Sequence, residues 1–150
     1  MKRLFYTLLV LTFLSCDNQD AWDCIQTAGA PAVQVLNVEA FEKILVNRDI
    51  KLVVKQGHDY KVEIQTGENL LSNIAVLVVD NQLQLTDANN CNYVRDFGLT
   101  KMIVTTPILK EIRSSTQYLT ASEGVLNFES LALVSENFNS NYLSSGDFNM

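Results

Sequence analysis

The sequence predicts an all-β protein. Apolar and polar side chains alternate in several stretches, as from Tyr60 to Gln65 (YKVEIQ), and this period of two is typical of strands with one buried face. Asp80 and Asn81 lie between two such stretches, and both residue types tolerate the positive φ of a tight hairpin. No stretch shows sustained helical periodicity. We therefore expect strands joined by turns throughout.

The expected strands can be placed in order along the chain. They cover residues 50–55, 60–65, 74–79, 82–86 and 101–106. The stretch at 74–79 (IAVLVV) is apolar at every position, so we expect it to be buried on both faces. An asparagine-rich loop, residues 87–92 (DANNCN), follows the hairpin.

The last third of the chain contains an internal repeat. Leu109 to Ser115 (LKEIRSS) is followed about 22 residues later by Leu131 to Glu136 (LALVSE). Tyr118-Leu119-Thr120 returns about 24 residues on as Tyr142-Leu143-Ser144. Short apolar pairs that return at this spacing are typical of β-solenoid turns. Two copies therefore predict solenoid turns over about 107–150.

The N-terminus has the pattern of an export signal. Met1-Lys2-Arg3 is basic, and Leu4 to Leu14 (LFYTLLVLTFL) is apolar but too short for a membrane span, which needs about 20 residues. Phe13-Leu14-Ser15-Cys16 resembles the lipobox of bacterial lipoproteins, with Phe13 in place of the usual leucine. The resemblance implies cleavage before Cys16 and acylation of that residue, with palmitate or a similar chain. The alternative is a plain signal peptide with a chance cysteine.

This interpretation divides the chain into three parts. We expect a lipoprotein signal peptide at 1–15, a lipidated tether at 16–37 and a β domain at 38–150. The protein would then be an outer-membrane lipoprotein that faces either the periplasm or the cell surface. Asp17 and Asp20 resemble the surface-export signals of Bacteroidota lipoproteins, although Asn18 and Gln19 dilute the acidic run.

Cleavage would leave a strongly acidic chain. The full sequence has 11 basic and 17 acidic residues and a net charge of −6. Loss of the signal removes Lys2 and Arg3 and no acidic residue, so the net charge becomes −8. Such a surface repels nucleic acid and anionic headgroups. Nucleic acid is therefore excluded as a partner, and the contact with the membrane is expected to depend on the lipid.

Two cysteines, Cys24 and Cys91, remain after Cys16. In an oxidising compartment two such thiols pair more often than they stay free, so we predict a disulfide between them. Trp22 is expected to pack on this disulfide as a hydrophobic plug. Neither cysteine has the C-x-x-C spacing, and the single histidine, His58, lies far from both. We therefore expect no metal site and no cofactor.

No catalytic group is expected either. His58 lies in a Gly-His-Asp turn, and no serine or cysteine motif points to it as part of a triad. Asp80, Asp87 and Asp96 could supply oxygen ligands to calcium, together with the nearby asparagines. The loop lacks the alternating acidic register of a calcium site, however, so turn formation is the preferred interpretation.

Several stretches, in this order, resemble the head GIN domain found in autotransporter adhesins and in short lipoproteins of Bacteroidota. They are Phe41 to Ile44 (FEKI), Ile50 to Gly57 (IKLVVKQG), Tyr60 to Thr66 (YKVEIQT), Val79 to Leu85 (VDNQLQL) and Thr105 to Pro107 (TTP). The resemblance covers about residues 38–150. It implies an N-terminal β-meander, here about 38–106, leading into a right-handed, single-stranded β-solenoid at about 107–150. It implies no catalytic or cofactor residues.

The chain departs from that family in two respects. Arg113 to Gln117 (RSSTQ) and Glu136 to Asn141 (ENFNSN) stand where relatives carry Gly-Ser-Gly tracts. The family domain also runs for several more turns, so the solenoid is expected to be incomplete at the C-terminus. An uncapped last turn leaves backbone groups unpaired, so we expect either a fragment or self-association through that end.

Together these features predict a lipid-anchored, non-enzymatic binding or adhesion module of the cell envelope or cell surface. Its expected ligand is a glycan or an envelope or surface protein. The alternative is a structural or accessory envelope lipoprotein that partners other envelope proteins, and an envelope hydrolase is disfavoured. The expected binding face is formed by Tyr118, Asn137, Asn139, Asn141 and Tyr142.

Overall fold

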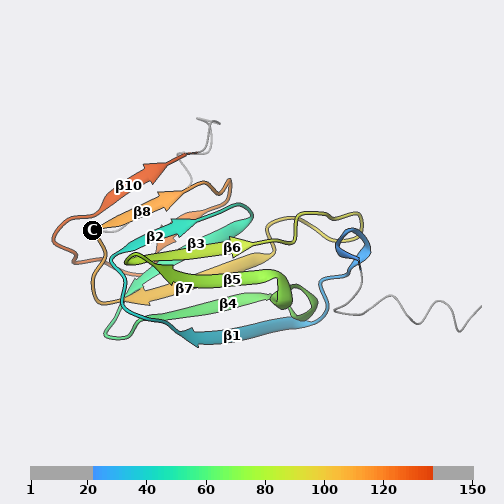
Figure 1. The fold of residues 1–150 in the computed structure, drawn as a ribbon, viewed down its shortest axis with the longest axis horizontal. Coiled ribbons are helices and arrows are strands. Elements are labelled where there is room, and N and C mark those ends of the chain that lie inside the picture. Colours follow the sequence, from blue (N-terminus) through green and yellow to red (C-terminus); the bar gives the residue numbers. More distant parts are fainter. Residues whose placement is uncertain (1–21, 137–150) are drawn as a thin grey trace, which may run out of the picture.

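The computed structural model describes residues 22–136, which form two five-stranded β-sheets (Figure 1). The first sheet, in spatial order, contains β1 (Pro31–Asn37), β4 (Lys61–Gly67), β7 (Thr100–Thr106), β3 (Ile50–Gln56) and β9 (Thr120–Ser122). The second contains β10 (Ala132–Ser135), β8 (Glu111–Ser114), β2 (Lys43–Val46), β6 (Gln82–Asp87) and β5 (Ile74–Val79). Two short 3₁₀ helices, η2 (Asp23–Ile25) and η3 (Glu68–Asn73), are the helical elements of this region. The predicted all-β class is confirmed. The predicted β-meander at about 38–106 is wrong, because β2 and β3 belong to different sheets and β3 pairs in parallel with β7 and β9.

Both sheets are mixed, and neither closes into a barrel. Strands β6, β2, β8 and β10 run parallel to one another, and so do β7, β3 and β9. Antiparallel pairing joins β1 to β4, β4 to β7 and β5 to β6. The chain crosses from the second sheet to the first at β2–β3, β6–β7 and β8–β9. Parallel β8 and β10 contain the two copies of the predicted repeat, whereas the solenoid itself stays a prediction.

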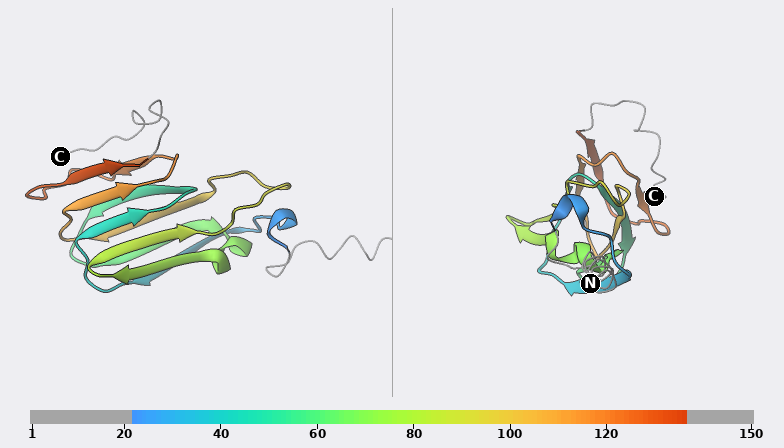
Figure 2. Two further views of the ribbon diagram at one scale, coloured as in Figure 1. Left: turned by 45° about the horizontal axis from the view of Figure 1, so that its top comes forward. Right: turned by 90° about the vertical axis from the view of Figure 1, so that its right-hand side faces the viewer.

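The two sheets face each other and enclose one apolar core (Figure 2). In-register neighbours in the second sheet place Leu83, Ile44 and Ile112 in one row, and each is at most 1 % exposed. Leu52 and Met102 form a similar buried pair in the first sheet. The alternating sequence pattern therefore directs one face of each central strand into the core.

The hairpin prediction at Asp80 and Asn81 is confirmed. Their φ angles are 50° and 63°, and β5 and β6 pair antiparallel on either side of them. A two-residue turn with positive φ at both positions matches the twist of the flanking strands.

The prediction that residues 74–79 are buried on both faces is wrong. β5 is an edge strand that pairs only with β6, and its side chains alternate between half-buried and exposed. Leu77 is 57 % exposed and Val79 is 45 % exposed. Because the second sheet is covered on one face only, an apolar residue at every position cannot bury both sides of the strand.

Strand β1 lies within the range that the sequence analysis assigns to the tether, and it pairs along its whole length with β4. The division of the chain into signal, tether and domain otherwise stays a prediction. No helix in residues 22–136 combines the length and the apolar character needed to cross a bilayer.

Candidate functional site

Three connections meet at one end of the molecule. β6, β2 and β8 are parallel neighbours, so their carboxyl ends lie at the same edge of the second sheet. The connections that leave this edge are residues 47–49, 88–99 and 115–119. Residues far apart in sequence are thereby brought together, and this arrangement defines what we call the three-loop end (Figure 1).

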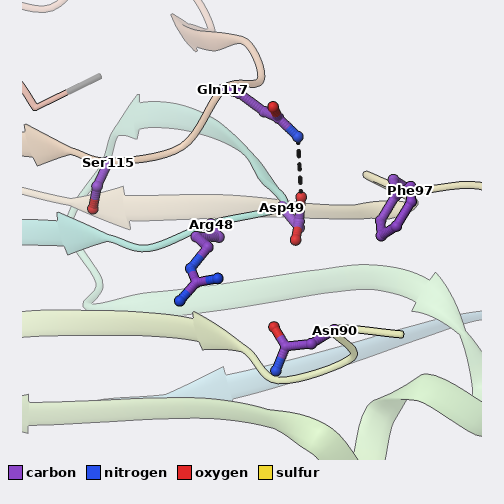
Figure 3. Close-up of a pocket in the computed structure, with 6 residues that line it drawn as sticks. All are labelled: Arg48, Asp49, Asn90, Phe97, Ser115 and Gln117. Carbon is purple, nitrogen blue, oxygen red and sulfur yellow. Dashed lines mark hydrogen bonds between the residues drawn. The ribbon is translucent and has the colours of Figure 1, made fainter. Parts of the chain in front are cut away.

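A pocket of about 370 Å³ lies between these connections (Figure 3). It is lined by Arg48, Asp49, Asn90, Phe97, Ser115 and Gln117. The lining thus combines a cation, a carboxyl group, two amides, a hydroxyl group and an aromatic ring. Such a set can both donate and accept hydrogen bonds.

The pocket walls are fixed by bonds to the sheets. Asn47 Nδ2 donates to Thr86 Oγ1 at 3.0 Å, which ties the first connection to the end of β6. Thr116 Oγ1 donates to the backbone oxygen of Ile50 at 2.8 Å, and the Ser115 amide donates to the oxygen of Val46 at 3.0 Å. The backbone beneath the pocket is therefore preorganised.

Asp49 is held in an uncommon backbone conformation for a residue with a side chain. Its φ is 61°, and its Oδ1 accepts a bond from Gln117 Nε2 at 3.4 Å. Partial burial raises the pKa of the Asp49 carboxyl, and the nearby Asp87 charge adds to this, while the Gln117 bond and Arg48 oppose it. Arg48 forms no salt bridge with any other described residue, so its guanidinium is available to a ligand.

We expect Asp49→Asn to stabilise the fold increasingly as the pH rises from below 3.8 toward neutrality. The pKa of Asp49 is raised from 3.8 in the folded state, so the folded state binds more protons than the unfolded state across this range. Ionisation of Asp49 therefore lowers the free energy of unfolding of the wild type as the pH rises. Asparagine does not ionise, so the variant does not undergo this loss. Urea midpoints of both proteins at pH 3.5 and 7 measure the effect. An equal difference at the two pH values would contradict it.

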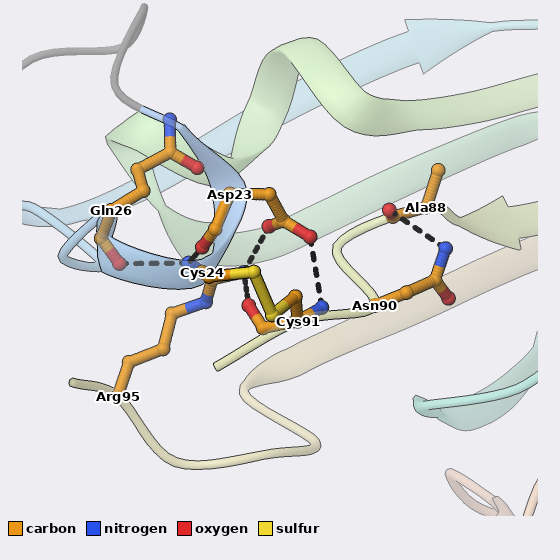
Figure 4. The surroundings of a disulfide bond; sticks show 7 residues. All are labelled: Asp23, Cys24, Gln26, Ala88, Asn90, Cys91 and Arg95. Atoms are coloured by element: carbon orange, nitrogen blue, oxygen red, sulfur yellow. Dashed lines mark hydrogen bonds and ion pairs between the residues drawn. A yellow bond between two sulfur atoms is a disulfide. The ribbon is translucent and has the colours of Figure 1, made fainter. Parts of the chain in front are cut away.

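The predicted disulfide between Cys24 and Cys91 is present and lies at the three-loop end (Figure 4). It joins the segment of η2 to the loop 88–99, which lines the pocket. The Cys91 amide also donates to Asp23 Oδ2 at 2.8 Å, and the Tyr93 amide donates to the Cys24 oxygen at 2.9 Å. The loop is therefore attached to the N-terminal segment at several points.

Arg95, which sequence reasoning did not single out, completes this attachment. Its side chain is only 4 % exposed and forms an ion pair with Asp23. It also donates to the backbone oxygens of Asp23, Gln26 and Cys91 at 2.6, 2.7 and 2.8 Å. Arg95 is the only basic residue between β6 and β7, and this is the one signal by which the sequence could have revealed it.

The prediction that Trp22 packs on the disulfide as a plug is wrong. Trp22 is 73 % exposed. Cys24 is nevertheless buried, at 9 % exposed, and its backbone oxygen accepts a bond from the Tyr93 amide of the loop 88–99.

Of the predicted binding face, only Tyr118 lies in the described residues. It follows Gln117 in sequence but is not among the residues that line the pocket. The loop backbone at Gly98, where φ is 66°, packs so closely on the Tyr118 ring that a Cβ there would lie 2.3 Å from Cζ. Burial and the Asp49 charge raise the pKa of Tyr118. The other predicted residues, Asn137, Asn139, Asn141 and Tyr142, lie outside the described region, as does Cys16.

The fold resembles several solved structures. A "putative adhesin" from Bacteroides fragilis has a TM-score of 0.65 and 21 % identity, covering 79 % of this chain and 52 % of its own. A "putative adhesin" from Parabacteroides merdae has a TM-score of 0.62 and 18 % identity, covering 71 % of this chain and 44 % of its own. A "putative lipid binding protein" from Parabacteroides distasonis has a TM-score of 0.56 and 15 % identity, with coverages of 71 % and 46 %. The chain therefore spans about half the length of these proteins.

No curated protein matches the chain. The family model described as "Putative auto-transporter adhesin, head GIN domain" matches residues 40–150, which is most of the sequence. The resemblance inferred from the sequence is thereby confirmed, and the chain belongs to the head GIN domain family.

Proposed function

We propose that this protein is a non-enzymatic binding module of the cell envelope and that the pocket at the three-loop end is its binding site. The observation that carries the proposal is the meeting of three connections around one pocket with polar, charged and aromatic walls. The family description, an adhesin head domain, supports a role at the envelope or cell surface.

The position of His58 supports a role without catalysis. β3 begins directly after Asp49 and ends before His58, so about seven strand residues, or roughly 23 Å, separate the histidine from the pocket. Among the pocket residues, Ser115 is the one hydroxyl nucleophile, and no histidine accompanies it. The lining can bind and orient a ligand, but it lacks the histidine that commonly activates a serine.

A glycan is the ligand class that fits this lining best. Sugar hydroxyls both donate and accept hydrogen bonds, which the Asn90 and Gln117 amides and the Asp49 carboxyl can satisfy. Phe97, 55 % exposed, offers an apolar surface for a sugar ring. Arg48 adds a cation suited to a carboxylated sugar.

To test this proposal, the purified chain is applied to arrays of glycans, of matrix proteins and of the proteins of its own cell envelope. The same preparation is incubated with libraries of ester, glycoside and peptide substrates. Saturable binding without turnover is expected. Turnover of any library substrate that is lost on changing one pocket residue would contradict the non-enzymatic function.

A second candidate, an accessory lipoprotein that partners envelope proteins, is favoured by the sheet edges. β1 and β5 are edge strands with exposed apolar side chains, including Val33 at 64 % and Leu77 at 57 %. Unpaired edges of this kind can accept a strand from another protein. Recovery of envelope proteins alone from the arrays would favour this candidate.

We also propose that the stacked parallel strands are turns of a solenoid that continues at β10. Leu133 is in register with buried Ile112, yet it is 49 % exposed, so the apolar row remains open at this edge. A further strand, from this chain or from a second copy, would cover it. Light scattering at several concentrations distinguishes association through this edge from a monomer.

Attachment through a lipid on Cys16, at the outer membrane, completes the proposal. We expect Cys16→Ala to move the protein from the membrane fraction to the soluble fraction, because several acyl chains anchor stably and the acidic chain offers no basic patch as a substitute. A double variant, Cys24→Ser with Cys91→Ser, keeps Cys16 and serves as the control, which should stay with the membrane. If Cys16→Ala still fractionates with membranes, the anchor is elsewhere.

A further inference from the structure

Four exposed apolar side chains lie within three residues of the disulfide cysteines in the sequence. Trp22 is 73 % exposed, Tyr93 80 %, Val94 54 % and Ile25 48 %. We call these four residues the aromatic knuckle. They come from two segments that the Cys24–Cys91 bond joins across 67 positions of sequence. The two segments that carry the knuckle, η2 with Trp22 before it and the loop 88–99, lie at the three-loop end of the molecule (Figure 1).

The knuckle backbone is rigid. Besides the disulfide, the bond from the Tyr93 amide to the Cys24 oxygen at 2.9 Å holds its two segments together. Arg95, buried between them, binds backbone oxygens of both. The exposed side chains are therefore displayed on a fixed base, and little backbone entropy would be lost when they bind something.

The chemistry of the knuckle fits the interface of a lipid bilayer. Tryptophan and tyrosine are enriched at membrane interfaces, where the ring meets the acyl region and the polar group stays hydrated. Ile25 and Val94 add aliphatic surface beside them. The charge of Asp23, the acidic residue within η2, is paired with Arg95 and would not oppose insertion among zwitterionic headgroups.

The length of the preceding chain keeps this surface near the membrane. Only six residue steps separate Cys16 from Trp22, and a fully extended chain of that length spans at most about 20 Å. If Cys16 is acylated, as proposed above, the knuckle cannot leave the neighbourhood of the bilayer. Tethering of this kind gives a high effective concentration, so weak partitioning is sufficient for contact.

We propose that the aromatic knuckle inserts into the headgroup region of the membrane that carries the lipid anchor. The inference rests on the proposed anchor at Cys16. Insertion orients the domain so that its three-loop end faces the bilayer. The turns at the opposite end, such as Asp80-Asn81, then point away from it. Loop 88–99 contains both Tyr93 and the pocket residue Phe97, so insertion of the knuckle also holds the pocket close to the membrane.

The test uses the chain from Cys16 onward, produced without lipid. The sequence has three cysteines, two of which form the disulfide, so the Cys16 thiol can be coupled to a maleimide lipid in phosphatidylcholine vesicles. Trp22 is the sole tryptophan and reports its own environment. We expect blue-shifted emission on coupling and strong quenching when the vesicles contain brominated acyl chains.

Two double variants test whether the knuckle side chains, rather than the tether alone, bring Trp22 into the bilayer. Tyr93→Ser with Val94→Ser should reduce the quenching several-fold. The control, Val33→Ser with Val35→Ser, removes apolar groups that are 64 % and 55 % exposed on β1 and should leave quenching unchanged. All four residues are exposed, so both variants should fold, which circular dichroism verifies.

Emission and quenching identical to those of the uncoupled protein would overturn the proposal. Full quenching in the Tyr93→Ser, Val94→Ser variant would also overturn it, because the tether alone would then explain the quenching. Coupling is chemical, so this result does not depend on acylation in the cell. Failure of the natural anchor is detected separately, by fractionation of Cys16→Ala.

Discussion

Replacing Cys24 and Cys91 together by serine should lower the free energy of unfolding by about 4 kcal/mol. The disulfide closes a loop of 67 residues. On the chain-entropy model, a cross-link over that length lowers the conformational entropy of the denatured state, which stabilises the native state by about 4 kcal/mol. The loss is large beside the roughly 5–15 kcal/mol by which native domains are stable. Urea unfolding of the oxidised wild type and of the variant measures it.

Cys16→Ser is the matched control for this experiment, since it removes a thiol outside the disulfide and should leave the urea midpoint unchanged. Mass spectrometry of unreduced peptides should also find Cys24 joined to Cys91. Quantitative alkylation of both cysteines without reductant, or a double variant within about 1 kcal/mol of the wild type, would contradict the role given to the bond.

Phe41→Ala should lower the free energy of unfolding by about 3–5 kcal/mol, the usual cost of removing a fully buried phenylalanine. Phe41 is 0 % exposed and precedes β2, where it lies in the core between the sheets. Its ring meets the Tyr60 ring edge to face, with 5.4 Å between the centroids. Alanine would leave a cavity that the surrounding strands can fill only in part.

Phe97→Ala is the control for this second prediction. Phe97 has the same side chain but is 55 % exposed, so its loss should cost less than about 1 kcal/mol. Chemical denaturation of the three proteins under one set of conditions provides the comparison. Equal midpoints for the two variants would mean that Phe41 does not belong to the core as described.

The sequence predicted those features of the fold that depend on neighbours along the chain. The residue pattern located five of the ten described strands, β3 to β7, and Asp80-Asn81 located the hairpin, because strand period and turn conformation are local properties. The stretch at 74–79 was misjudged because an apolar run alone does not reveal whether a strand lies at the centre or at the edge of its sheet. That distinction depends on pairing, and β2 pairs with β6 and β8, which are remote in sequence.

The candidate site could be predicted only in small part, for the same reason. Its lining comes from connections that begin near Arg48, Asn90 and Ser115, and only the parallel order of β6, β2 and β8 brings them together. Of the predicted face, Tyr118 lies in the connection 115–119 that lines the pocket, but it is not itself a lining residue. The proximity of Trp22 to Cys24 in sequence predicts a plug on the disulfide, but it does not determine where the side chain points, and Trp22 is 73 % exposed.

The central claim, that the pocket at the three-loop end binds the ligand, is tested most directly by titrating a ligand found on the arrays against paired variants. Arg48→Ala with Gln117→Ala removes a cation and an amide from the pocket, whereas Lys61→Ala with Gln84→Ala removes the same kinds of group from β4 and β6. Calorimetry should show binding about 10- to 100-fold weaker for the pocket variant, as expected for the loss of one or two hydrogen bonds that involve a charge, and wild-type affinity for the control. Unchanged affinity in the pocket variant would contradict the assignment of the binding site.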